Sequence, residues 1–152
     1  MSLSSGPQLE FRPLAANDVE AISGVHHRAC LIAYRFMSWR YPIDEVERWY
    51  AGKFAEWSWT RAALDADVIV GFIALKDRHI DQLYVDPNHQ RRGIGTALLE
   101  QAIRSVPGRI TLDVFEDNLG ARAFYEKHAF SARDRWMNEQ EGAIDLLYMR
   151  EG

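Results

Sequence analysis

The segment VDPNHQRRGIGTALLEQAI, residues 85–103, places two arginines and two glycines directly ahead of an apolar pattern typical of a helix. The first backbone N–H groups of a helix have no partner within it and carry about half a positive charge. Gly93 and Gly95 lack the Cβ atoms that would keep a ligand away from these groups. Arg91 and Arg92 would add positive charge at the mouth of the turn. The segment therefore predicts a binding site for an anionic group such as a phosphate.

Two known phosphate-binding turns, the P-loop and the dinucleotide-binding turn, do not match this segment. A P-loop requires a lysine after the second glycine, and no lysine follows Gly95. A dinucleotide-binding fingerprint requires a third glycine, but Leu98 occupies that position. An ordinary strand-to-helix loop with two turn glycines stays open as the alternative to an anion site.

The composition is that of one globular domain. The chain has 152 residues, of which 47% are hydrophobic and 26% are charged, and this length is enough to bury a core. The net charge of −4 and the pI near 5.7 argue against a general nucleic-acid binder, which usually has a strongly basic face. We expect residues 1–8 to be a disordered leader and residues 9–152 to form a single domain.

The cysteine and histidine content argues against disulfides and against a metal centre. Cys30 is the one cysteine of the sequence, which fits a small core residue in a reducing compartment. The histidines show neither an HExxH motif nor a pairing with cysteine, so we expect no bound metal. The sequence has no run of 18 apolar residues and no signal-peptide pattern, so we expect a cytoplasmic protein.

The spacing of apolar residues predicts the elements that must position these groups. Asn17 with Glu20, and Asp44 with Glu47, have the spacing of capping boxes, so each pair predicts the start of a helix. The pattern as a whole predicts an α/β (layered α+β) fold with a mixed central sheet flanked by helices. We expect strands at 9–14, 57–64, 68–75, 80–85, 109–115 and 143–150, and helices at 17–36, 44–50, 94–106 and 116–130.

Residues 90–95 and 113–130 together resemble two signatures of the GNAT N-acyltransferase superfamily. QRRGIG matches the acyl-CoA binding pattern Q/R-x-x-G-x-G/A and follows the strand LYV and the dipeptide DP. In DVFEDNLGARAFYEKHAF an asparagine comes five residues after an acidic strand position, and a tyrosine comes seven residues after the asparagine. The resemblance extends over residues 9–150. It implies the GNAT fold and the activity of a small bacterial-type, acetyl-CoA-dependent N-acetyltransferase.

The resemblance also implies how acetyl-CoA would be held. In the family, backbone amides of the glycine turn bind the pyrophosphate. The strand end before the turn pairs with the pantetheine amides, as an extended peptide pairs with a sheet edge. The residues of this sequence at those positions are Leu83, Tyr84, Val85, Gln90, Arg91, Arg92, Gly93, Ile94, Gly95 and Thr96, and the second signature adds Asn118 and Tyr125.

Acyl transfer to an amine further requires an oxyanion donor, an acid and a route for the amine proton. A backbone N–H close to Val85 is the candidate for the oxyanion donor. Tyr125 matches the family tyrosine that protonates the leaving thiolate, and reference pKa values of about 8.5 for a thiol and about 10 for a phenol make that transfer workable. His79, Asp81 and Asp113 are open alternatives for the base, as is a chain of waters.

One residue departs from the family pattern. Family members usually have Gly-Phe after the last helix, whereas this chain has Ala129 followed by Phe130. If the position requires a left-handed backbone, alanine costs roughly 1 kcal/mol there. The departure concerns the end of the helix and not the activity.

The sequence leaves the acceptor open. We expect an amine of a small molecule or peptide, with a slight preference for a cation because the chain is acidic. We expect neither nucleic acid nor membrane as a partner, and exposed aromatic surface would be compatible with a homodimer. A non-catalytic acyl-CoA sensor and an acyltransferase with another acyl donor are the alternatives. A further hypothesis is that some aromatic rings line the acceptor pocket: Trp39, Tyr41, Trp49, Tyr50, Trp57 and Trp59.

Overall fold

A seven-stranded sheet in the order β1-β2-β3-β4-β5-β7-β6 organises the computed structural model, which describes residues 9–34, 41–90 and 92–152. All neighbouring strands are antiparallel except β4 and β5, which are parallel. The predicted α/β fold with a mixed sheet is therefore confirmed. The strands are β1 (Leu9–Arg12), β2 (Trp59–Asp65), β3 (Val68–Lys76), β4 (His79–Val85), β5 (Ile110–Phe115), β6 (Ser131–Asn138) and β7 (Ala143–Arg150), and the helices are α1 (Val19–Ala33), α2 (Ile43–Ala51), α3 (Ile94–Ser105) and α4 (Leu119–Lys127).

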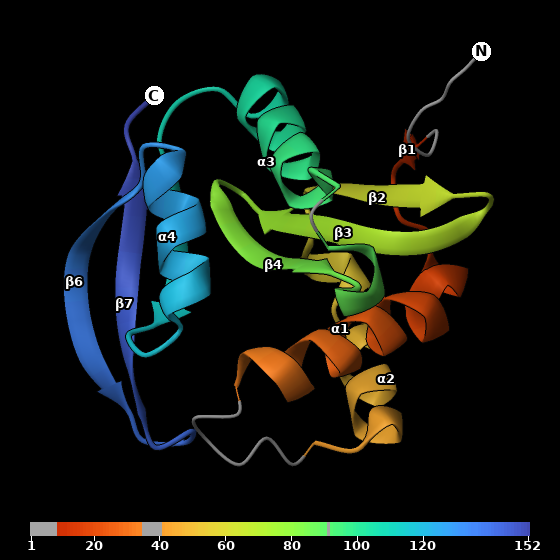
Figure 1. The fold of residues 1–152 in the computed structure, drawn as a ribbon, viewed down its shortest axis with the longest axis horizontal. Coiled ribbons are helices and arrows are strands. Elements are labelled where there is room, and N and C mark those ends of the chain that lie inside the picture. The colour runs from red at the N-terminus through yellow and green to blue at the C-terminus, as the bar shows by residue number, and fades with distance from the viewer. Residues whose placement is uncertain (1–8, 35–40, 91) are drawn as a thin grey trace.

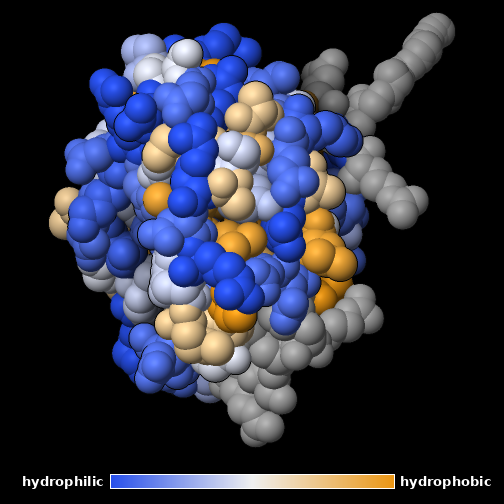
Figure 2. Space-filling model, turned by 90° about the vertical axis from the view of Figure 1, so that its left-hand side faces the viewer, coloured by the Kyte–Doolittle hydropathy of each residue, from blue (hydrophilic) through white to orange (hydrophobic). Residues whose placement is uncertain are grey.

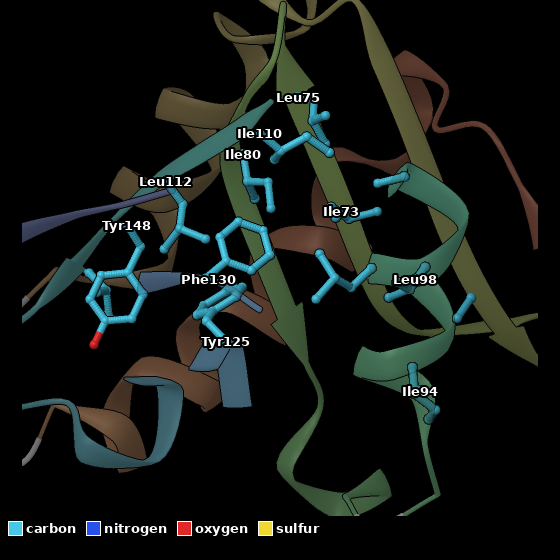
Figure 3. Close-up of a cluster of buried hydrophobic side chains, with 14 of the residues drawn as sticks. Ile73, Leu75, Ile80, Ile94, Leu98, Ile110, Leu112, Tyr125, Phe130 and Tyr148 are labelled. Carbon is cyan, nitrogen blue, oxygen red and sulfur yellow. The ribbon is translucent and has the colours of Figure 1, made fainter. Parts of the chain in front are cut away.

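Helices cover both faces of the sheet (Figure 1). Successive side chains of a strand point to opposite faces, so a strand buried on both faces is apolar at every position. In β3, Phe72 packs with α1 and α2, whereas its neighbour Ile73 packs with α3 and α4. The second of these cores contains Leu98 of α3 and Tyr125 of α4 (Figure 3). The glycine turn and the second signature therefore lie on the same face of the sheet.

The first predicted capping box is wrong. Asn17 lies inside a short 3-10 turn, Ala16–Asp18, and α1 begins after that turn. The carboxylate of Asp18 accepts a hydrogen bond from the backbone N–H of Ala15 at 2.7 Å and pairs with Arg12 at 2.8 Å. The start of α1 is therefore held by a contact to β1, which local spacing does not reveal.

The second capping box and one strand boundary also differ from the prediction. Helix α2 begins at Ile43 with Pro42 as its N-cap, and Asp44 pairs with Arg48 at 3.6 Å on the exposed side of the helix. Pro42 has an extended backbone, and its carbonyl accepts the first helical hydrogen bond from the N–H of Val46 at 3.1 Å, without a side-chain cap. Strand β2 begins at Trp59, because Phe54–Glu56 forms another 3-10 turn before it.

Strand β6 is an element that the sequence patterns did not predict. It forms the edge of the sheet, and seven of its eight residues are exposed. Its centre is charged, with Arg133, Asp134 and Arg135 in succession, so it lacks the apolar alternation of a strand that covers a core. The face of the molecule that carries this strand is largely hydrophilic (Figure 2). Strand β6 is held in the sheet by its pairing with β7 along its whole length and not by an apolar face.

The parallel strands β4 and β5 separate after a short contact. Their register contains only His79↔Thr111 and Ile80↔Leu112, although both strands continue beyond these pairs. On the other edge of β4, Ile80 pairs with Leu75 and Gln82 with Ala74, so Asp81 is the extra residue of a β-bulge. A bulge bends its strand and increases its twist. The bulge therefore accounts for the divergence of β4 from β5.

Candidate active site

A cavity of about 1010 Å³ occupies the space between the separated strands. Strands β4 and β5 supply its walls, and the ends of α1, α3 and α4 close it. The cavity therefore connects the glycine turn to the bulge of β4. It is lined by the predicted residues Leu83, Tyr84, Val85, Gln90, Gly93, Ile94, Gly95, Thr96, Asn118 and Tyr125, together with Asp81 and Asp113.

The glycine turn has the backbone conformation that an anion site requires. Gly93 is the N-cap of α3 and has a φ of 73°, in the left-handed region. A Cβ at Gly93 would meet no protein atom within 4 Å, so it would point into open space. At Gly95 a Cβ would lie 3.5 Å from Phe124, at ordinary van der Waals distance. The positive φ explains the first glycine of the motif, and the free N–H groups of the first turn of α3 lie beside the cavity.

Asp86 anchors the segment that leads into the turn. It is buried, accepts a hydrogen bond from the N–H of Asn88 at 3.0 Å, and pairs with Arg28 of α1 at 2.7 Å. Burial alone would raise the pKa of Asp86, but the hydrogen bonds from Arg28 and Asn88 outweigh it and hold the pKa below its usual value. The DP dipeptide thus has a structural reason: its carboxylate ties the turn to α1.

Of the two arginines of the motif, the structure describes Arg92. Arg91 lies outside the described residues. The guanidinium of Arg92 pairs with Asp65 at 2.9 Å and contacts His89, and Arg92 does not line the cavity. The structure therefore places Arg92 against the β2–β3 turn, and its predicted contact with phosphate would require this ion pair to open.

Tyr125 and Asn118 both come from the second signature. The ring of Tyr125 packs edge-on against Phe130 with 5.5 Å between ring centroids, inside the core (Figure 3). Burial raises the pKa of Tyr125 far above its usual value, so the phenol keeps its proton. The side-chain oxygen of Asn118 accepts a hydrogen bond from the N–H of Ala121 at 3.2 Å and caps α4. A protonated phenol on the cavity wall is the state that a general acid needs.

Of the candidates for the base, Asp81 has two side-chain partners. Its carboxylate accepts a hydrogen bond from the indole of Trp57 at 2.8 Å and pairs with Lys53 at 3.4 Å. Both contacts hold the side chain in place. Asp81 therefore lines the cavity as predicted, with its carboxylate in contact with Trp57 and Lys53.

Asp113 lines the cavity and pairs with His79, which is not one of the lining residues. Their side chains approach to 3.8 Å, and the other ring nitrogen of His79 lies 2.7 Å from the hydroxyl of Thr111. Burial raises the pKa of Asp113, His79 opposes this, and the carboxylates of Asp145 and Asp81 add to the increase. A carboxylate with a raised pKa is a better base than an ordinary one.

Two residues of the cavity wall escaped the sequence patterns. Asp145 of β7 is buried on the wall, and Asn138 donates a hydrogen bond to it at 2.8 Å. Tyr34 follows the last residue of α1 and lines the same cavity. Neither belongs to a motif. An acidic residue within the apolar run AIDLLYM was the one available signal for Asp145, and no signal in the sequence marked Tyr34.

The aromatic residues near the first helices serve mainly in packing. Tyr50 is fully buried and Trp57 binds Asp81, whereas Trp49 is 45% exposed. None of these three lines the cavity, and Trp39 lies outside the described residues. Tyr41 and Trp59 do not line it either, so the hypothesis that these particular rings form the acceptor pocket has no support from the described residues.

The remaining predictions concern Cys30, a metal centre and a membrane-spanning segment. Cys30 is fully buried and burial raises the pKa of its thiol to about 12, so it is an inert core residue as predicted. Among residues 9–34, 41–90 and 92–152, no three His, Cys, Asp or Glu side chains are grouped as metal ligands would be. In the same part of the chain, no helix has both the length and the apolar character needed to cross a bilayer.

Comparison with known proteins identifies relatives of the chain. A model of the Acetyltransferase (GNAT) family matches residues 27–130. The peptidyl-lysine N-acetyltransferase YjaB of Salmonella typhimurium is 33% identical over 118 residues, which are 76% of this chain and 79% of that protein. The solution structure of apo YjaB from Escherichia coli has a TM-score of 0.79 and 26% identity, with 95% of this chain and 99% of that chain covered. The PaiA N-acetyltransferase of Thermoplasma acidophilum, crystallised in complex with coenzyme A, has a TM-score of 0.74 and covers the same shares at 20% identity, which shows a common fold.

Proposed function

The chain belongs to the acetyltransferase (GNAT) family, and from this premise we propose that it transfers the acetyl group of acetyl-CoA to a primary amine, with the lysine side chain of a peptide as the favoured acceptor. Membership of the family makes it an acyltransferase. The name of the relative YjaB, a peptidyl-lysine N-acetyltransferase, supports lysine as the acceptor. An amine of a small molecule is the alternative acceptor.

The course of the cavity is the observation that carries this proposal. It begins at the glycine turn, follows the edge of β4 that β5 leaves after Ile80, and ends at the carboxylates of Asp113 and Asp145. A long donor and a separate acceptor could therefore meet at the point where the strands diverge. A simple binding module would need the first half of this cavity only.

The residues along the donor half fit acetyl-CoA. The N–H groups at the start of α3 would bind the pyrophosphate, with Gly93 allowing it to approach the backbone. The main chain of Leu83 to Val85 has a hydrogen-bonding edge that would pair with the amides of the pantetheine arm. Acetyl-CoA supplies the acetyl group as a thioester, whose carbon–sulfur bond breaks as the amine nitrogen bonds to the acetyl carbon.

The side chains at the divergence would move the protons. Tyr125 would give its proton to the departing thiolate, and a backbone N–H near Val85 would donate to the carbonyl oxygen as it gains negative charge. We assign the proton of the amine to Asp113, with His79 as its neighbour, because the carboxylate of Asp81 is held by other contacts. An alkylamine of pKa about 10 needs such a base, since deprotonation costs about 4 kcal/mol at neutral pH.

The charge of the cavity supports a cationic acceptor. The described residues on its wall include four carboxylates, those of Asp81, Asp113, Asp117 and Asp145. None of the described lining residues is a lysine or an arginine. Negative charge in a partly buried cavity attracts an ammonium group and raises its local concentration. A lysine side chain has both the charge and the length to reach a buried thioester.

Acetyl-CoA turnover with two matched peptides tests the proposal. One peptide has a single lysine and an acetylated N-terminus, and the other has a free N-terminus and norleucine in place of lysine. We expect release of coenzyme A with the lysine peptide at a kcat/KM at least about tenfold higher, because its amine stands at the end of a long side chain that can reach a buried thioester next to the proposed base Asp113. Mass spectrometry locates the acetyl group. Binding of acetyl-CoA without turnover of either peptide, or of a panel of small amines, would instead favour the sensor.

A further inference from the structure

On the cavity wall, the acidic residues of β5 and β7 point to one face of the sheet. Successive side chains of a strand alternate between the two faces. Leu112 of β5 and Leu146 of β7 pack in the core with α3 and α4. Their neighbours Asp113 and Asp145 therefore point to the opposite face, which α1 and α2 cover. A charged carboxylate accepts hydrogen bonds and donates none, so these two side chains can bind an ammonium group but not a carbonyl oxygen.

Gln82 of β4 brings an amide to the same face. Tyr84 packs in the core with α1 and α2, and Gln82 lies two residues before it, so both side chains point to that face. Gln82 also lines the cavity. Its amide has an oxygen that accepts hydrogen bonds and a nitrogen that donates them. The end of the amide that faces the cavity therefore decides which groups of an acceptor it can bind.

Two buried side chains fix the orientation of this amide. The hydroxyl of Tyr50, in α2, donates a hydrogen bond to Oε1 of Gln82 at 3.2 Å. Burial raises the pKa of Tyr50 well above its usual value, so the hydroxyl keeps its proton. Because this one proton is used on Gln82, Nδ1 of His26 is the donor in the 2.5 Å contact with the same hydroxyl. Both His26 and Tyr50 are buried, so the oxygen of the amide points towards the core.

The amide nitrogen of Gln82 is then the end that faces the cavity. Within the part of the chain that the structure describes, no hydrogen bond uses Nε2 of Gln82, and this atom is not among the buried polar atoms without a partner. It is therefore accessible from the cavity that Gln82 lines. A donor that its neighbours already hold in one orientation loses little conformational freedom when a ligand binds.

We propose that Gln82 is a specificity-determining residue, whose amide N–H donates a hydrogen bond to a main-chain carbonyl of the peptide that presents the acceptor lysine. The inference rests on the proposed function and names the part of the acceptor that the cavity recognises besides its amine. The carboxylates on this face attract any cationic amine, whereas the amide of Gln82 distinguishes an acceptor with a carbonyl group from one without. A lysine peptide would then be preferred to a simple alkylamine of equal charge.

Gln82→Glu tests this role, because the new carboxylate still accepts from Tyr50 and replaces the amide nitrogen by an oxygen. The acceptors are the lysine peptide with an acetylated N-terminus and n-butylamine, which has the four-carbon arm of lysine and no carbonyl. We expect the ratio of kcat/KM for the peptide to kcat/KM for n-butylamine to fall at least about fivefold, mainly through KM of the peptide, since one hydrogen bond is lost. Damage to the acetyl-CoA site, the acid or the base lowers both values and cancels in the ratio.

Two further variants separate the loss of the donor from the added charge. Gln82→Met keeps the length of the side chain and removes both polar groups, so it should lower the ratio by a similar factor. Gln101→Glu is the matched control. The amide oxygen of Gln101 accepts a hydrogen bond from Arg61 at 3.1 Å, and Gln101 does not line the cavity, so the ratio should equal that of the wild type.

The outcomes separate this inference from the proposed function. An unchanged ratio in either Gln82 variant would overturn the role of Gln82 and leave the proposed function standing. A higher ratio in Gln82→Glu would do the same, because it would mean that an oxygen at this position binds the peptide better than a donor does. A wild type that acetylates n-butylamine and not the peptide would also overturn the role of Gln82. A wild type that binds acetyl-CoA and acetylates neither acceptor would overturn both.

Discussion

At the scale of single residues, two side chains of the cavity wall, which we propose as the acid and the base, have raised pKa values. Tyr125 is buried in an aromatic environment, which disfavours the phenolate. Asp113 is half exposed beside His79, and its pKa is raised. The raised pKa keeps Tyr125 protonated, and the raised pKa of Asp113 makes its carboxylate a stronger base; shifted pKa values of this kind cluster at active sites. Each group yields a prediction of its own.

Replacing Tyr125 by phenylalanine should remove the acid and little else. The ring packs against Phe130 through its carbon atoms, so the variant should fold normally. We expect kcat to fall about a hundredfold, which is the usual lower range for the loss of a general acid. Steady-state kinetics with the lysine peptide measures the effect, and calorimetry with acetyl-CoA should give an unchanged Kd. A variant with normal kcat would show that another group protonates the thiolate.

Replacing Asp113 by asparagine should change the pH dependence of the reaction. A base must be deprotonated, so kcat/KM of the wild type falls as pH drops through the pKa of Asp113. Because burial raises that pKa, the fall should begin at a higher pH than for an ordinary aspartate at about 4. We expect Asp113→Asn to lose this acidic limb and about a hundredfold in kcat/KM at neutral pH.

The ratio of the two pH profiles is the measurement to use, because it cancels titration of the acceptor amine. The acidic limb should disappear from Asp113→Asn and persist in Asp81→Asn, since Trp57 and Lys53 hold the carboxylate of Asp81 in place. If the wild type and Asp113→Asn give pH profiles of equal shape, Asp113 is not the base, and a chain of waters would accept the proton of the amine.

At the scale of elements, the ends of helices determine the shape of the site. Gly93 begins α3 in the left-handed region, and a Cβ there would point into open space beside the cavity. Ala129 follows α4 with a φ of 71°, so the left-handed backbone considered for this position is present. Both positions favour glycine, and only one of them has it.

Gly93→Ala should weaken both the fold and the donor site. We expect the free energy of unfolding to fall by about 1 kcal/mol because of the positive φ. We expect the Kd of acetyl-CoA to rise at least about tenfold, because the new methyl group would enter the space assigned to the pyrophosphate. Gly95→Ala is the control, since its Cβ would lie at ordinary contact distance from Phe124 and its Kd should stay within about threefold. Equal affinities in both variants would place the pyrophosphate elsewhere.

Ala129→Gly should stabilise the protein. The present alanine costs roughly 1 kcal/mol in a left-handed conformation, and glycine would remove that cost. We expect the free energy of unfolding, measured in urea, to rise by about 1 kcal/mol with activity unchanged. Ala123→Gly, on the exposed side of α4, should instead lower it by about 1 kcal/mol. Two changes of the same sign would contradict the role of φ.

At the scale of the whole molecule, α1 connects several parts of the fold. Arg28 ties it to the segment before the glycine turn, Tyr34 at its end packs against Phe115 of β5, and His26 contacts the hydroxyl of Tyr50 in α2 at 2.5 Å. Tyr50 in turn donates a hydrogen bond to Gln82 of β4 at 3.2 Å. The helix therefore couples the stability of the molecule to the geometry of the site.

Burial of His26 should make the whole molecule sensitive to acid. Burial lowers the pKa of His26 to about 4, whereas in the unfolded chain the pKa is about 6.5. Between these values the unfolded state binds the extra proton, so the free energy of unfolding should fall as pH falls from about 6.5 to about 4, by about 3 kcal/mol. Urea unfolding from pH 7 to pH 4 measures this loss.

His26→Gln is the control for this effect, since glutamine keeps a polar group near Tyr50 and does not titrate. The variant should be less stable at pH 7 and should lose less stability between pH 7 and pH 4 than the wild type does. A loss of the same size in both proteins would assign the acid sensitivity to other groups.

The sequence by itself determined the features that depend on neighbouring residues. The apolar run of β3, the glycine turn before α3 and the tyrosine of α4 each follow from residue types at short spacing, and they were enough to predict the fold class and the family. Where a start or an edge depends on distant contacts, the prediction was wrong or missing. Asp18 bonds to β1 at the start of α1, and β6 has its pairing with β7 in place of an apolar pattern.

The tertiary structure alone decided how the reacting groups meet. Asp81 becomes a bulge only because of the register of β4 against β3, and that bulge separates β4 from β5 to leave the cavity. Tyr34 reaches the ring of Phe115, at the end of β5, only because α1 ends beside the cavity. Strand register depends on the packing of the whole chain, as do the contacts between distant elements. Neither can be predicted from the spacing of residues along the sequence.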